Sequence, residues 1–276
     1  MRTATILLVA ALLPAIALPG DPPAKGAAPA GAIAADDPKW KLVWNDEFDK
    51  PGLADPKKWS YETGRVRNRE AQTYTRERME NARVEDGSLI IEARKEKRDG
   101  AEYTSASLHT KGKGEWRRGR IEVRAKLPTG RGTWPAIWTL GVNMGEVGWP
   151  RCGEIDIMEN VGFDPDTIHA NIHTRAYNHI DNTHKGAKTT VAKPYEAFHV
   201  YAVEWLDDRL DFFVDGKLYF TFANDGKGEA SWPFDRPHYL LLNVAIGGSW
   251  GGQKGIDDGI FPQRLLVDYV RVYERR

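Results

Sequence analysis

The chain has 276 residues, with 39 basic and 39 acidic side chains and a formal net charge of zero. This length is enough for one large domain with a real hydrophobic core. The balanced charge gives no sign of a nucleic acid, a membrane surface or a polyanionic substrate as a partner. The single cysteine, Cys152, excludes an intramolecular disulfide and is predicted to be a small buried side chain.

The N-terminal residues predict export from the cell. A short, positively charged start is followed by an apolar stretch over residues 4–18 that contains Pro14. This stretch is too short for a membrane span and is typical of a secretory signal peptide, which we place at residues 1–18. Small-residue cleavage patterns end at Ala17 and again at Ala34, and both cleavage sites stay open.

Residues 19–39 are rich in proline, alanine and glycine, a composition that predicts a disordered linker. The folded domain is therefore expected to span residues 40–276. With the signal peptide removed, we expect a secreted, extracellular or periplasmic protein that acts as a monomer.

Strand signals dominate the domain, and neither a long amphipathic helix nor an internal repeat is evident. The strand-like runs are residues 88–95, 120–127, 198–205, 210–214, 217–222, 239–246 and 265–273. Residues 120–127 alternate strictly between polar and apolar, which predicts a half-buried strand with one wet face. Asp215-Gly216 is a type I′ hairpin signal, and residues 141–151 and 175–195 are expected to be long loops. These features predict an all-β, two-sheet antiparallel sandwich, most simply a β-jelly roll.

Three carboxylates fall within six residues of one predicted strand: Glu154, Asp156 and Glu159. On a regular strand Glu154 and Asp156 share a face, whereas Glu159 would turn into the core at a high free-energy cost. One extra residue at Ile157-Met158, a β-bulge, would return Glu159 to the face of the other two. The alternative is a solvated outer face with no chemical role.

Clustered carboxylates suit a glycosidase, which needs one ionised and one protonated carboxyl group at the same pH. Glu154 and Glu159 would stand roughly 13 Å apart along the strand. Side chains that lean toward each other could approach the separation of about 5–5.5 Å that retaining glycosidases use.

Several motifs together resemble glycoside hydrolase family sixteen, most closely its laminarinase, or endo-β-1,3-glucanase, branch. They are Gly119-Arg-Ile-Glu-Val-Arg-Ala-Lys-Leu-Pro128, Trp134-Pro-Ala-Ile-Trp138 and Gly153-Glu-Ile-Asp-Ile-Met-Glu159. The inserted Met158 is similar to the bulged strand of laminarinases rather than to the regular strand of lichenases. The resemblance implies a β-jelly roll with a substrate cleft on its concave face and retaining hydrolysis of an internal β-glucosidic bond without a catalytic cofactor. It implies that Glu154 is the nucleophile, that Glu159 is the acid/base and that Asp156 tunes both.

The same resemblance implies a set of sugar-binding residues. Trp134 and Trp138 are four residues apart, so on a strand they face the same way. Trp149 precedes the catalytic strand, and Trp250 lies in a glycine-rich loop. Core filling is the alternative interpretation for these tryptophans. The remaining implied residues are His173, expected to hydrogen-bond near Glu159 or the sugar, and the polar residues Asn68 and Arg83.

A structural calcium is a further implication of the resemblance, because many family members carry one on the convex face. The matching positions are Glu47, Gly87 and Asp268. Ordinary turn residues without an ion are the alternative. A pair of histidines, His169 and His173, also lies four residues apart, but no third metal ligand of suitable spacing is evident.

The expected partner is a β-glucan polysaccharide such as laminarin. Two alternatives stay open at this stage. One is a non-catalytic β-glucan-binding protein on the same fold. The other is a hydrolase of the same fold that acts on mixed-linkage β-glucan or on a galactan such as agarose.

Overall fold

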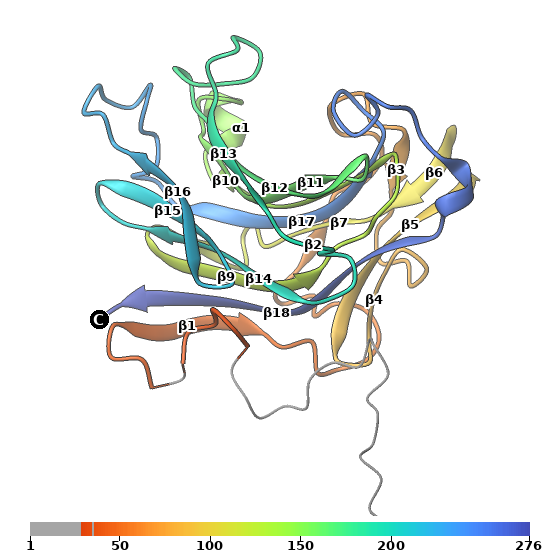
Figure 1. Ribbon diagram of the computed structural model, residues 1–276, viewed down its shortest axis with the longest axis horizontal. Helices are drawn as coiled ribbons and strands as arrows, with labels where there is room; N and C mark the ends of the chain where they lie inside the picture. Colours follow the sequence, from red (N-terminus) through yellow and green to blue (C-terminus); the bar gives the residue numbers. More distant parts are fainter. Residues whose placement is uncertain (1–28, 35) are drawn as a thin grey trace, which may run out of the picture.

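The computed structural model describes residues 29–34 and 36–276, and the predicted signal peptide at residues 1–18 lies outside them. These residues form two stacked β-sheets (Figure 1). Among the described strands, neighbours pair antiparallel except for β3 and β6, which run parallel. The expected all-β, two-sheet sandwich is confirmed.

The ten-stranded sheet has the order β16-β15-β14-β9-β18-β5-β6-β3, with β1 paired to β18 and β4 paired to β5. Its strands are β1 (Trp40–Asp46), β3 (Gln72–Tyr74), β4 (Ala82–Glu85), β5 (Ser88–Arg98), β6 (Ala101–Ser105), β9 (Gly119–Lys126), β14 (His199–Trp205), β15 (Arg209–Val214), β16 (Lys217–Ala223) and β18 (Gln263–Arg275).

The eight-stranded sheet has the order β13-β12-β11-β10-β17-β7-β2, with β8 paired to β17. Its strands are β2 (Ser60–Tyr61), β7 (Ser107–His109), β8 (Glu115–Trp116), β10 (Thr133–Gly141), β11 (Glu154–Val161), β12 (Asp164–His173), β13 (Lys185–Thr190) and β17 (His238–Ile246).

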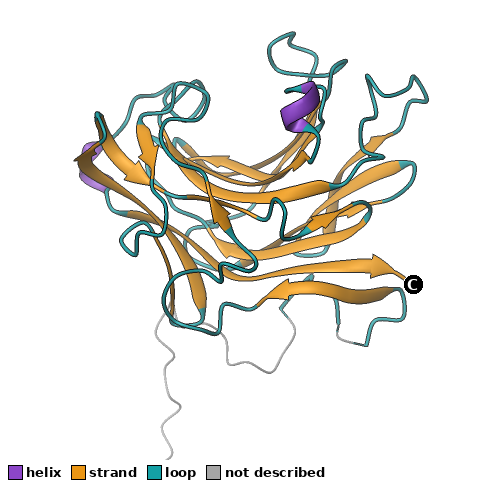
Figure 2. Cartoon of the chain, turned by 180° about the vertical axis from the view of Figure 1, so that it is seen from behind, coloured by secondary structure: helices purple, strands orange, loops and turns teal. Residues whose placement is uncertain are grey.

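Helical structure in the described residues is limited to two turns outside the sheets, α1 (Met144–Val147) and η1 (Asp258–Ile260) (Figure 2). Neither turn has the length or the apolar character that crossing a bilayer would require.

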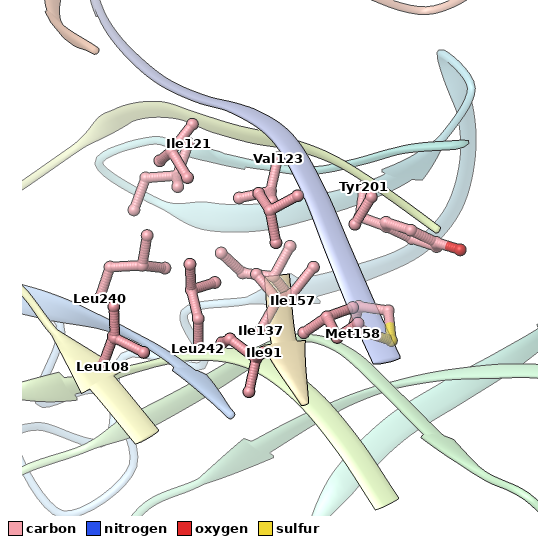
Figure 3. Packing of buried hydrophobic residues seen from close by; sticks show 14 of the residues in the cluster. Ile91, Leu108, Ile121, Val123, Ile137, Ile157, Met158, Tyr201, Leu240 and Leu242 are labelled. Carbon is pink, nitrogen blue, oxygen red and sulfur yellow. The ribbon is translucent and has the colours of Figure 1, made fainter. Parts of the chain in front are cut away.

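The hydrophobic core lies between the two sheets (Figure 3). Ile121 and Val123 of β9 face Leu240 and Leu242 of β17, and all four are almost fully buried. Each such side chain contributes roughly 1.5–3 kcal/mol to folding. The other surface of the eight-stranded sheet faces away from this core and is concave (Figure 1). We call this surface, which carries Trp134, Trp138 and Asp156, the open face.

The predicted wet face of residues 120–127 is wrong, because every residue of β9 except the last is buried. Arg120 is 2 % and Glu122 is 0 % exposed, and these two side chains pair with each other at 3.0 Å. Glu204 and the Tyr269 hydroxyl, which donates to Glu122 at 2.8 Å, complete the polar cluster. Charges can be buried here because each has a partner.

Part of this cluster is covered by a segment that the sequence predicted to be a disordered linker. The Ile33 N–H donates to Glu122 Oε2 at 3.2 Å, and Arg120 Nη2 donates to the Gly31 carbonyl at 3.1 Å. Gly31 packs so closely on the Asp215-Gly216 turn that a Cβ atom would meet its backbone. The described end of the predicted linker is therefore docked on the domain.

Turn and loop predictions had mixed outcomes. Asp215 and Gly216 have φ angles of +48° and +75°, which fits the expected type I′ hairpin between β15 and β16. The predicted loop at residues 175–195 is partly wrong, because it contains β13. That strand pairs with β12 alone and shows the pattern of an exposed edge, so its sequence lacks the apolar alternation that marks a strand.

Candidate active site

β11 carries the three acids, and its predicted bulge is confirmed. On the neighbouring strand β10, Trp138 pairs with Asp156 but Ile137 pairs with Met158, so Ile157 has no partner of its own. The register with β12 breaks over the same residues. Both Ile157 and Met158 therefore point into the core (Figure 3), and the side chain of Glu159 returns to the open face.

Each catalytic candidate glutamate is held by an indole donor. Trp149 Nε1 donates to Glu154 Oε2 at 2.9 Å, and Trp134 Nε1 donates to Glu159 Oε1 at 3.0 Å. A second donor, Asn171 Nδ2, reaches Glu159 Oε2 at 2.7 Å. Hydrogen bonds of this kind fix the carboxylates in place and stabilise their ionised forms.

Burial dominates the electrostatics of the site. It raises the pKa of Glu154 to about 8, and the neighbouring Asp156 carboxylate adds to the rise. Burial likewise raises the pKa of Asp156 and of Glu159. At Glu159, burial is the cause of the raised pKa, and the hydrogen bonds from Asn171 and Trp134 act against it. For Glu154 the raised pKa opposes the ionised state that a nucleophile needs, and the charges of His173 and Arg67 and the Trp149 donor favour the anion.

His173 lies nearer to Glu154 and Asp156 than the sequence suggested. Its Nε2 is 3.4 Å from Asp156 Oδ2 and 3.7 Å from Glu154 Oε1. In the described part of the chain, these three residues make up the one cluster of three or more His, Cys, Asp or Glu side chains whose ligand atoms could share a metal ion. His169 is not part of it and instead contacts the Trp250 ring, so the two histidines do not form a metal pair.

The other predicted tryptophans also reach the open face, but with different surroundings. Trp250 packs edge-on against Trp134 with a ring-centroid distance of 5.6 Å. Trp138 donates Nε1 to Asn243 Oδ1 at 2.7 Å and is only 6 % exposed. The guanidinium of Arg67 lies over its ring, at 4.8 Å from the centroid. Trp138 is therefore a covered side chain rather than a free stacking platform.

Of the two predicted polar residues, one lies at the open face and one does not. Asn68 adopts a left-handed backbone conformation, and its carbonyl accepts a hydrogen bond from the Ser249 N–H beside Trp250. Arg83 lies on β4 in the other sheet, where it pairs with Glu85 and with Glu92. The predicted substrate contact of Arg83 is therefore wrong.

Two residues at the site were missed, for different reasons. Asn171 lies between His169 and His173 on β12, so strand alternation places all three on one face and was a usable signal. Arg67 comes from a loop between β2 and β3 and contacts Trp138 of β10. No local pattern connects residues so far apart in the sequence.

A compact loop between β12 and β13 borders the site. Asn178 is 2 % exposed and holds the loop together through bonds to the backbone of Thr174 and to the side chain of Asp181. The loop brings His179 to 5.0 Å from the Trp149 ring, between ring centroids. Since Trp149 holds Glu154, this loop supports the Glu154 side of the site.

The predicted calcium residues lie near one another at the junction of β1, β5 and β18. β1 ends opposite Val270, and Asp268 is at a bulge where β18 loses its register with β9. Both carboxylate oxygens of Glu47 bind Arg271, and Arg124 donates to Asp268 Oδ2 at 2.7 Å. Calcium takes hard oxygen ligands, and with both carboxylates paired to arginines the calcium site at Glu47, Gly87 and Asp268 stays a prediction.

Known proteins match this chain along most of its length. Residues 68–271 match the family described as Glycosyl hydrolases family 16. A beta-glucanase from Rhodothermus marinus is 53 % identical over 245 residues, which cover 86 % of each chain.

Solved structures extend the likeness to the fold. The laminarinase from Rhodothermus marinus superposes with a TM-score of 0.84 at 52 % identity, covering 86 % of this chain and 98 % of its own. SCLam, described as a non-specific endo-β-1,3(4)-glucanase of the same family, gives a TM-score of 0.83 at 51 % identity over 90 % of this chain and 96 % of its own. The β-jelly roll is thereby confirmed, and the chain belongs to glycosyl hydrolase family 16.

Proposed function

We propose that this protein is a retaining endo-glycosidase that hydrolyses internal β-1,3-glucosidic bonds in laminarin-like β-glucans. The observation that carries the proposal is the bulge in β11, which brings Glu159 to the face of Glu154 and Asp156. Two glutamates on one face, each held by its own indole donor, supply the pair of carboxyl groups that a double displacement uses. The laminarinase from Rhodothermus marinus supports the choice of substrate.

The first step forms a covalent glycosyl-enzyme. The Glu154 carboxylate attacks the anomeric carbon, the bond to the leaving sugar oxygen breaks, and Glu159 gives its proton to that oxygen. In the second step the Glu159 carboxylate takes a proton from water, and the water oxygen attacks the same carbon and releases Glu154. Two inversions give net retention. His173 and Asp156 position and tune Glu154, and the reaction needs no cofactor.

Replacing the proposed nucleophile is the direct test. Glu154→Gln keeps the size of the side chain but cannot form the ester, so hydrolysis of laminarin should fall by at least about a thousandfold while sugar binding persists. Reducing-end release measures the rate, and calorimetry with a short β-1,3-glucan measures binding. Turnover near that of the wild type would reject the role of Glu154. In the wild type, NMR should show the β-anomer as the first product.

Mixed-linkage β-glucan is a second candidate substrate, because the similar protein SCLam is described as a non-specific endo-β-1,3(4)-glucanase. Digestion of laminarin, curdlan, lichenan, xyloglucan and agarose, followed by product sizing, separates the candidates. Binding of one glucan with no digestion of any would favour a non-catalytic binding protein. The presence of both glutamates favours the enzyme.

Export and calcium binding complete the proposal. The apolar N-terminal stretch supports secretion of a single-chain enzyme, which would meet polysaccharide outside the cell. A calcium ion at Glu47, Gly87 and Asp268 would lie away from the open face and would stabilise the fold alone. Chelation should then lower Tm and leave kcat unchanged at temperatures well below Tm. An unchanged Tm with and without added calcium would reject the ion.

A further inference from the structure

Arg67 occupies a position beside the acids that the reaction described above does not use. Its guanidinium lies over the ring of Trp138, whose partner across the strands is Asp156. The positive charge is close enough to act on the Glu154 carboxyl group. A large part of the side chain is withdrawn from water, with 21 % of it exposed.

The guanidinium is only partly satisfied. Nη2 pairs with Glu62, which also accepts a hydrogen bond from the Ser107 hydroxyl at 2.6 Å. Nη1 is buried and has no hydrogen-bond partner within the described part of the protein. Leaving a charged donor buried and unpaired costs free energy, so an acceptor that arrives with a ligand would be favoured.

The support beneath Arg67 is rigid. Trp138 Nε1 donates to Asn243, Asn243 Nδ2 donates to the Tyr74 hydroxyl at 3.1 Å, and that hydroxyl donates to Glu70 at 3.2 Å. A guanidinium stacked on a fixed ring is pre-oriented, so little rotamer entropy remains to be lost when it binds a ligand.

The surrounding charge selects the class of ligand. Glu62 and Glu70 both act on Arg67, and the three acids of β11 are close by. Acidic groups therefore outnumber this one cation, which disfavours a sulfated or carboxylated sugar. A neutral acceptor such as a sugar hydroxyl matches the buried donor.

We propose that Arg67 is a substrate-binding residue whose Nη1 donates a hydrogen bond to a hydroxyl of the neutral glucan unit bound beside Glu154. The proposal rests on the glucanase function above. Since Arg67 covers Trp138, the sugar at this point meets a planar donor and not a bare indole. A hydrogen bond from Arg67 therefore distinguishes sugars by the position of a hydroxyl group. An aromatic ring at the same place would recognise only the apolar face of the sugar ring.

Binding is measured in the Glu154→Gln background, so that turnover does not interfere. Adding Arg67→Met should weaken binding of a β-1,3-gluco-oligosaccharide about tenfold or more, since a charge-assisted hydrogen bond is lost. Arg69 is an exposed arginine of the same loop and provides the matched control. Arg69→Met should change Kd less than about twofold, within the usual range for surface changes.

A pH profile separates a direct role from a structural one. In otherwise wild-type enzyme, Arg67→Met removes a positive charge near Glu154, so the acidic limb of kcat/KM should move to higher pH. Arg67→Lys keeps the positive charge, so the acidic limb of kcat/KM should not move. Because the lysine lacks the planar guanidinium that stacks on Trp138, the variant should still bind sugar several-fold more weakly. This variant also keeps a partner for Glu62, so it tests the proposal if Arg67→Met fails to fold.

The outcomes are distinct. Folded Arg67→Met and Arg67→Lys variants that bind oligosaccharide as tightly as their parent would overturn the role of Arg67 while the glucanase function stands. Wild-type protein that cleaves no β-1,3-glucan would instead overturn the proposed function.

Discussion

Burying three carboxyl groups on β11 lowers the free energy of unfolding at neutral and alkaline pH. Glu154, Asp156 and Glu159 are carboxyl groups whose pKa values burial raises, so at neutral pH the native state binds protons that the unfolded chain would release. Folding therefore becomes less favourable as the pH rises past the ordinary range of a carboxyl group. Catalytic sites commonly carry such a cost.

We expect Glu154→Gln to stabilise the protein at alkaline pH. The pKa of Glu154 rises from 4.5 to about 8 on folding. The contribution of this carboxyl group to the free energy of unfolding is therefore fully present below pH 4.5 and is lost as the pH rises toward 8. A neutral amide does not titrate. The variant should exceed the wild type in Tm by at least about 3 °C at pH 8.5.

Calorimetric scans at pH 4 and pH 8.5 measure this difference, which should nearly vanish at pH 4. A Tm difference that is equal at the two pH values would show that Glu154 is not strained by burial. Glu85→Gln is a suitable control, because Glu85 is an exposed acid on the other sheet.

At the scale of elements, the parity of β11 decides which way its second glutamate points. Side chains alternate with a period of two, so the residue count between Glu154 and Glu159 fixes whether both share a face. Glu159 is five positions after Glu154, an odd number that would place the two on opposite faces of a regular strand. The bulge at Ile157 takes up one residue and returns Glu159 to the face of Glu154.

Two length variants test this parity. Deleting Met158 removes the bulge and places the second glutamate four positions after Glu154 in a regular strand, so it keeps facing outward. This variant should fold with a lower Tm, because a core side chain is lost at a cost of about 2–5 kcal/mol, and it should retain measurable hydrolysis.

Deleting Ile157 together with Met158 leaves the glutamate three positions after Glu154 in a regular strand, so it should turn inward and activity should be abolished. Laminarin hydrolysis and circular dichroism measure the two effects. A folded double-deletion variant that is more active than the single-deletion variant would contradict the parity argument.

Elements with regular periodicity could be read from the sequence, and the exceptions have physical causes. The bulge was predictable because the alternative buried an unpaired carboxylate. The edge strand β13 was not, since a strand paired on one side and exposed elsewhere needs no apolar alternation. The polar side chains of β9 were predicted to be exposed to solvent, because the sequence does not distinguish buried, paired charges from exposed ones. Arg67 and Arg83 show the same limit, because each is placed by partners distant in the chain.

On the scale of the whole molecule, the two sheets have separate tasks. The eight-stranded sheet presents the acids, and the ten-stranded sheet closes the core from the other side. The segment at residues 31–33 covers the polar cluster of Arg120 and Glu122 on the latter.

Removing residues 1–38 should therefore lower Tm by several degrees without changing kcat. The truncation exposes a buried ion pair that loses two hydrogen bonds to the segment, each worth about 1 kcal/mol. Thermal scans and laminarin assays on chains that begin at residue 29 and at residue 39 measure the effect. Equal Tm values for the two would show that the contact with Gly31 and Ile33 adds nothing.

β11 pairs with β10 on one side and with β12 on the other, so it is an interior strand of its sheet. The reacting groups thus stand on a strand that is hydrogen-bonded on both sides, whereas Arg67, His179 and Trp250 come from connecting segments around the site. Chemistry and selectivity can then diverge independently. Substitutions in the loops could therefore change which polysaccharide the protein binds while the three acids of β11 stay the same.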